Sequence, residues 1–185
     1  MSRYPVLTLD TAPESSRPAL TQLQQAFGRI PDIAATMAAS PVLINAFIGL
    51  FQRVHASSLS ELQIQTLLLT NAVTNACEWA VAFHSALALE AGVTRADVDA
   101  MRDGALPADH NLAALSQLAR TLIERRGRID DADQQRFFDA GFRAEQVLEV
   151  IAVVAASTIT NYTGSVTQPP LEAPFEAFIW RTNTR

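Results

Sequence analysis

The stretch SELQIQTLLLTNAVTNACEWAVAFH, residues 60–84, decides the fold class of this chain. It opens on Ser60, followed three residues later by Gln63, which is the spacing of a helix capping box. A long apolar run follows, and such a run is typical of a helix buried in a bundle. Residues 75–76 interrupt it, and Cys77 begins a second apolar segment. The stretch therefore predicts two consecutive buried helices.

Similar helix starts and stops continue on both sides of this stretch. They predict one helix that ends near residues 28–31 and another that begins at residues 40–41. Four more are predicted over residues 94–104, 109–126, 130–141 and 143–162. Strand signals are almost absent, because the sequence has no Asn-Gly turn and no sustained alternation beyond residues 4–9. We expect an all-α bundle of about eight helices, formed as one domain by residues 15–185, with an extended N-terminal arm over residues 1–14.

The composition indicates a weakly charged protein with a large apolar core. Of the 185 residues, 49% are hydrophobic and 18% are charged, and the net charge is −5. This acidic balance without a basic stripe argues against nucleic acid as a partner. The longest apolar run, residues 150–159, is too short to cross a membrane, and the first residues lack the pattern of a signal peptide. We expect a cytoplasmic protein, with part of its surface covered in a homo-oligomer.

The only cysteine, Cys77, and a nearby histidine, His84, form the candidate site. A single cysteine excludes an intramolecular disulfide and a multi-cysteine metal site, and no His-x-x-x-His or Glu-x-x-His spacing occurs. We therefore expect no metal and no cofactor. Seven residues separate Cys77 from His84, so both would lie on the same face of one helix. A thiol and an imidazole on one face could form a thiolate–base pair.

Each candidate residue also has a purely structural interpretation. Cys77 at a helix start could be a stabilised thiolate, or a small buried hydrophobe like most lone cysteines. His84 could line a pocket or be an interior histidine bonded to a carbonyl. Trp79 could wall a ligand pocket or pack against a neighbouring subunit. The sequence leaves these alternatives open.

Residues 59–101, LSELQIQTLLLTNAVTNACEWAVAFHSALALEAGVTRADVDAM, carry a family resemblance. They are similar to the core of the carboxymuconolactone decarboxylase and alkylhydroperoxidase D-like (AhpD-like) family. The family pattern has a Glu twelve residues before a Cys-x-x-Cys, which is followed by x-x-x-His. The flanks FGRIPDIAATMAASPVL, residues 27–43, and DAGFRAEQVLEVIAVVAASTITNY, residues 139–162, resemble the peroxidase-related branch. The resemblance covers roughly residues 15–180.

The resemblance implies an all-helical fold, assembly as trimers, hexamers or related homo-oligomers, and thiol chemistry driven by a Glu–His proton relay. This chain departs from that pattern twice. Ala80 stands where the family has its second cysteine, and Gln65 stands where it has the relay Glu. Gln keeps the hydrogen bonds of Glu but cannot accept a proton at neutral pH. We therefore expect a degenerate site with at most one-cysteine chemistry, in which Cys77, His84 and Gln65 are the candidate catalytic residues.

Three further residues are candidates for contact with a small-molecule substrate or ligand. Trp79 and Ala80 flank the degenerate motif, and Tyr162 belongs to the Asn-Tyr pair at the expected end of the last long helix. Two alternatives to an oxidoreductase-class function stay open. One is a cofactor-free decarboxylase or isomerase that acts on a small organic acid or lactone through His84. The other is a non-catalytic, oligomeric ligand-binding protein, so the sequence leaves enzymatic activity undecided.

Overall fold

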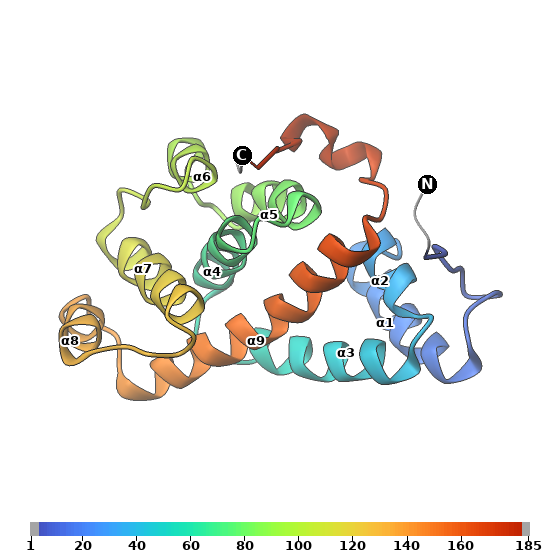
Figure 1. Ribbon diagram of the computed structural model, residues 1–185, viewed down its shortest axis with the longest axis horizontal. Coiled ribbons are helices and arrows are strands. Elements are labelled where there is room, and N and C mark those ends of the chain that lie inside the picture. Colours follow the sequence, from blue (N-terminus) through green and yellow to red (C-terminus); the bar gives the residue numbers. More distant parts are fainter. Residues whose placement is uncertain (1–3, 183–185) are drawn as a thin grey trace.

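The structure, a computed structural model, describes residues 4–182 and is all-α over that range (Figure 1). The α-helices, in chain order, are α1 (Arg17–Phe27), α2 (Asp32–Met37), α3 (Pro41–His55), α4 (Glu61–Thr74), α5 (Glu78–Glu90), α6 (Arg95–Arg102), α7 (His110–Glu124), α8 (Asp131–Asp139) and α9 (Ala144–Thr167). Two short 3-10 helices, η1 (Glu14–Ser16) and η2 (Ala173–Phe178), flank this series. The expected all-α fold is confirmed.

The predicted caps define most of the helix starts. Ser60 and Gln63 form the expected capping box of α4, and the Ser40 hydroxyl accepts from the backbone N–H of Leu43 at the start of α3. Two elements differ from the expectation. The six-residue α2 was not predicted, because so short a helix gives no repeated apolar stripe. Helix α9 continues past residue 162 to Thr167, because Asn161 is buried and bonded inside the bundle instead of capping the helix.

Helix α9, which has 24 residues, runs across the molecule and packs against five other helices (Figure 1). It contacts α2 and α3 toward one end, α7 toward the other, and α4 and α5 between them. Its length and composition would suffice to cross a membrane, but one face of it is a buried core face within the bundle. Helix α4 contributes to both main hydrophobic clusters, so α4 and α9 together position the rest of the bundle.

The two chain ends lie over the helices as irregular segments. Residues 4–13 form no strand, and the backbone N–H of Leu7 donates to Ala35 on α2; residues 1–3 of the expected arm lie outside the described range. In the segment that follows α9 along the chain, the carboxylate of Glu172 accepts hydrogen bonds from the indole N–H of Trp79 at 3.1 Å and from the backbone N–H of Asp32 at 2.9 Å. The C-terminal segment is thereby fixed across the starts of α2 and α5.

The start of α5 lies close against α9 because residue 164 is a glycine. A Cβ added to Gly164 would lie 2.7 Å from Sγ of Cys77 and 3.3 Å from Cδ1 of Ile33. A separation of 2.7 Å is far below van der Waals contact, so no other residue fits here without displacing its neighbours. The glycine in the last turn of α9 is therefore a packing requirement of the Cys77 side chain.

We predict that Gly164→Ala lowers the free energy of unfolding by about 1–3 kcal/mol, the usual cost of overpacking. In a Cys77→Ala background the same substitution should cost clearly less, because the sulfur that it would strike is gone. Urea denaturation of the four proteins in this double-mutant cycle measures the difference. Gly49→Ala on α3 is the matched control, since a Cβ there meets only Arg53 Nη1, at 3.8 Å. An equal loss of unfolding free energy with and without the Cys77 sulfur would contradict the close packing of Gly164 against Cys77.

Candidate active site

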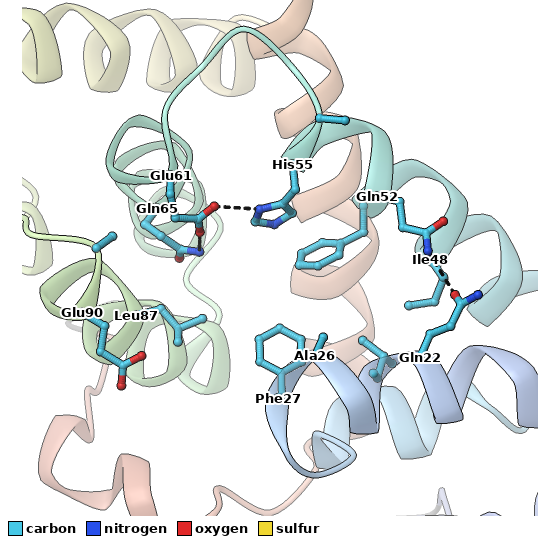
Figure 2. Close-up of a pocket in the computed structure, with 14 residues that line it drawn as sticks. Gln22, Ala26, Phe27, Ile48, Gln52, His55, Glu61, Gln65, Leu87 and Glu90 are labelled. Carbon is cyan, nitrogen blue, oxygen red and sulfur yellow. Dashed lines mark hydrogen bonds and ion pairs between the residues drawn. The ribbon is translucent and has the colours of Figure 1, made fainter.

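A chain of three hydrogen bonds links two histidines across α3, α4 and α5. Nδ1 of the buried His84, on α5, lies 3.1 Å from Oε1 of Gln65 on α4. Nε2 of Gln65 donates to Oε1 of Glu61, one turn earlier on α4, at 2.7 Å. Oε2 of Glu61 lies 2.9 Å from Nδ1 of His55 at the end of α3 (Figure 2). The structure thus brings together Gln65 and His84, two of the predicted site residues.

The carboxylate of Glu61 fixes the direction of every bond in this chain. A carboxylate only accepts hydrogen bonds, so the amide N–H of Gln65 and the Nδ1–H of His55 must both donate to it. The amide oxygen of Gln65 is then left to accept from Nδ1–H of His84. Both imidazoles therefore carry their proton on Nδ1 when neutral, and each keeps a lone pair on Nε2.

The environment of His84 keeps its ring neutral. Burial, and to a smaller extent the charge of His55, lowers the pKa of His84 from its ordinary value to about 3. A glutamate at position 65 would oppose this effect, but the Gln65 amide carries no charge. His84 therefore acts as a neutral hydrogen-bonding group, and it is a weaker base than the sequence led us to expect.

His84 lines a small inner cavity of about 40 Å³. Trp79 and Phe83 form one wall, with ring centroids 4.8 Å apart and nearly parallel planes. The hydroxyls of Ser157 and Thr160 on α9 are the other polar groups of the lining. A volume of about 40 Å³ holds water but no organic substrate, so a reactant must occupy a larger space.

That larger space is an outer pocket of about 570 Å³ between α1, α3, α4 and α5 (Figure 2). Leu23, Phe27 and Phe51 line both spaces and separate them. Gln65 lines the outer pocket whereas His84 lines the inner cavity. The Gln65–His84 hydrogen bond therefore joins the two spaces through their common wall.

Cys77 does not share a helix face with His84, which corrects the prediction drawn from their spacing. Cys77 is the N-cap of α5 and has extended backbone angles, so helical periodicity does not orient its side chain. The thiol is 1% exposed and lies against α9, where Ser165 is its hydrogen-bonding partner. Burial raises the pKa of the Cys77 thiol, and the hydrogen bonds from Ala80, Ser165 and Trp79 offset this only in part.

The three predicted ligand-contact residues have different environments. Trp79 lines the inner cavity and stacks on Phe83, as a pocket wall would. Ala80 is completely buried, and Tyr162 is 63% exposed on the outer side of α9. Neither of these two is among the residues that line the inner cavity or the outer pocket.

Sequence reasoning missed the His55–Glu61 pair. His55 is the last residue of α3 and Glu61 is the first of α4, joined by the loop of residues 56–60. A basic group at a helix C-terminus and an acidic group at a helix N-terminus are each favoured by the helix dipole. That pairing of consecutive helix ends is the signal that could have identified the site. Within residues 4–182, no cluster of three His, Cys, Asp or Glu side chains could hold a metal ion.

Comparison with known proteins agrees with this architecture. Residues 41–124 match the sequence profile of the carboxymuconolactone decarboxylase family. A peroxidase-related protein from Ralstonia eutropha JMP134, described as an alkylhydroperoxidase AhpD core, superposes with a TM-score of 0.83 over 94% of each chain, at 19% identity. Residues 41–124 thus resemble the carboxymuconolactone decarboxylase family, and the chain has an AhpD-like fold. None of the curated proteins matches its sequence significantly.

Two further solved structures share the AhpD-like fold. A peroxidase-related protein from Silicibacter sp. TM1040 has a TM-score of 0.78 at 18% identity, over 94% of this chain and 92% of its own. The debrominase Bmp8, in a cysteine-to-alanine variant complexed with 2,3,4-tribromopyrrole, also has a TM-score of 0.78 at 18% identity, over 96% of this chain and 97% of its own. At such identities the likeness shows a common fold.

We predict that His84 makes folding measurably sensitive to acid. Because the folded-state pKa lies below the unfolded value, the unfolded chain alone takes up this proton between about pH 6.5 and pH 3. Stability is therefore fully present above pH 6.5 and falls by up to about 1.4 kcal/mol per pH unit as the pH drops through this range.

The measurement is urea denaturation across this pH range of the wild type and of His84→Asn, whose side-chain amide can still donate to Gln65. The other titrating groups are common to both proteins, so the free energy of unfolding should fall less steeply with decreasing pH in the variant than in the wild type. Equal slopes would contradict a neutral, buried His84.

Proposed function

We propose that this AhpD-like protein is a cofactor-free enzyme that moves a proton on a small, uncharged organic molecule such as a lactone. The observation that carries the proposal is the continuous chain His84–Gln65–Glu61–His55, which connects an apolar inner cavity with an outer pocket of substrate size. Enzymes commonly use an imidazole oriented by a carboxylate for proton transfer.

The environment of the sulfur argues against the thiol chemistry of the peroxidase-related branch. A peroxide-reducing cysteine must be ionised and reachable, whereas Cys77 is buried and its pKa is raised. The second thiol position is Ala80, which is completely buried. The one-cysteine reaction considered from the sequence therefore has little support, and the non-redox alternative is favoured.

The charges around the site favour a neutral substrate over an organic acid. Among residues 4–182, no charged side chain lines the inner cavity apart from the titratable His84, and the outer pocket is lined by the carboxylates of Glu61 and Glu90 without any arginine. An anionic acid would meet repulsion there without a compensating cation. A lactone offers a carbonyl and an apolar ring without a charge.

An exposed apolar face on α9 supports the expectation of a homo-oligomer, of the trimer, hexamer or related type. Its exposed members, spaced by helical turns, are Leu148, Ile151, Ala155, Tyr162 and Val166. An exposed apolar face of this kind is usually covered by another protein surface. A second copy of the chain is the proposed partner, and the cytoplasmic location stays a prediction.

We predict that the protein accelerates exchange of the carbon-bound proton next to the carbonyl of a small unsaturated lactone, such as α-angelica lactone, in deuterated water. The C–H electron pair stays on the substrate while the proton leaves to the protein, and a deuteron from solvent replaces it. Proton NMR measures the rate. His84→Ala removes the inner end of the hydrogen-bond chain that orients His55 in the outer pocket, and it should lower the rate by about a hundredfold, the cost of misplacing a catalytic group.

Cys77→Ser is the matched control and should retain the wild-type exchange rate. Gln65→Leu is a second variant that interrupts the same hydrogen-bond chain while the imidazole of His84 stays in place. Retained exchange in both His84→Ala and Gln65→Leu would refute the proposal. Turnover of tert-butyl hydroperoxide that depends on Cys77, together with alkylation of Cys77 faster than that of free cysteine, would instead establish the thiol reaction.

A further inference from the structure

We infer that the outer pocket binds a neutral aromatic or alicyclic molecule with one weakly acidic hydroxyl, a phenol or an enol, whose hydrogen is accepted by Nε2 of His55. The inference rests on the proposed function, because it places the substrate of that reaction in the outer pocket and names its class. An enol is also the form through which a carbon acid such as a lactone exchanges its proton.

The unsatisfied nitrogen of His55 is the first observation. Its Nδ1–H is engaged by Glu61 at 2.9 Å, while Nε2 is buried and has no hydrogen-bond partner in the part of the chain that the structure describes. Leaving a buried acceptor unpaired costs on the order of 1–3 kcal/mol. A ligand that donates a hydrogen bond to Nε2 would recover this cost.

The shape and lining of the pocket are the second observation. A volume of about 570 Å³ falls in the range of small-molecule sites. The walls are mainly apolar and include Phe27, Ile48 and Leu87 (Figure 2), together with Phe51. The His55 ring lies 4.3 Å from the Phe51 ring, so the nitrogen is positioned beside a flat aromatic wall. A planar apolar body with a single polar atom fits this arrangement.

The charges of the pocket decide between a hydroxyl and an anion. Glu61 and Glu90 are the acidic groups in the lining, and both repel a carboxylate. In its neutral form His55 donates Nδ1–H to Glu61, so Nε2 is an acceptor and requires a donor from the ligand. If the hydroxyl proton transfers, the O–H bond breaks, the electron pair stays on oxygen, and the resulting imidazolium is stabilised by the Glu61 carboxylate.

Three naphthalenes of nearly equal shape test the inference at neutral pH: 2-naphthol, its methyl ether 2-methoxynaphthalene, and the anion 2-naphthoate. Their own fluorescence reports binding to the full-length protein. We expect 2-naphthol to bind about five to ten times more tightly than the methyl ether, the value of one hydrogen bond, and 2-naphthoate to bind most weakly.

His55→Phe keeps a planar ring but removes the nitrogen, and it should abolish the preference for 2-naphthol over the methyl ether. His110→Ala replaces an exposed histidine at the start of α7, away from the outer pocket, and should leave the preference unchanged. Equal binding of naphthol and ether by the wild type, a preference that survives His55→Phe, or tightest binding of 2-naphthoate would each overturn the inference.

These binding results are separate from lactone exchange. If naphthol binding depends on His55 but no exchange is catalysed, the hydroxyl site stands and the proposed reaction fails. If exchange depends on His84 while naphthol and ether bind alike, the proposed reaction stands and the hydroxyl site fails.

Discussion

The hydrogen bond between Nδ1–H of His84 and Oε1 of Gln65 is the interaction on which the rest of the site depends. It crosses the interface between α4 and α5, where both side chains are buried. Removing either partner would leave a buried polar group unpaired, at a cost on the order of 1–3 kcal/mol. This bond also sets the tautomer of His84 and, through the Gln65 amide, connects it to the carboxylate of Glu61.

The two departures from the family pattern fit a single physical account. An ionised glutamate at position 65, which is only 4% exposed, would need a buried charge partner. Gln65 keeps the geometry without that cost, and the carboxylate of the chain stands one helical turn earlier at Glu61, whose side chain is 54% exposed. With Ala80 in place of a thiol and Cys77 packed against Gly164, no sulfur requires ionisation by the relay.

Much of this fold is predictable from local signals, because the helix starts have caps and the helices have apolar stripes. Ser40, Ser60 and the apolar run after Ser60 are sufficient to place α3, α4 and α5. The contact between Gln65 and His84 was indicated by the family motif. The orientation of Cys77 was not predictable, because an N-cap residue leaves the helical periodicity and its side-chain direction depends on α9. The His55–Glu61 pair depends on how the loop of residues 56–60 folds back, which no periodic pattern encodes.

The most direct test of the account is the protonation state of His84 in solution. Two-dimensional ¹H–¹⁵N spectra that correlate ring nitrogens with carbon-bound ring protons distinguish the two neutral tautomers from the imidazolium, and His84→Asn assigns the signals. The account predicts a neutral His84 with its proton on Nδ1, and this form should persist well below pH 6.5, toward a pKa of about 3. A ring protonated on Nε2 at neutral pH, or one that titrates near its ordinary pKa, would contradict the central claim.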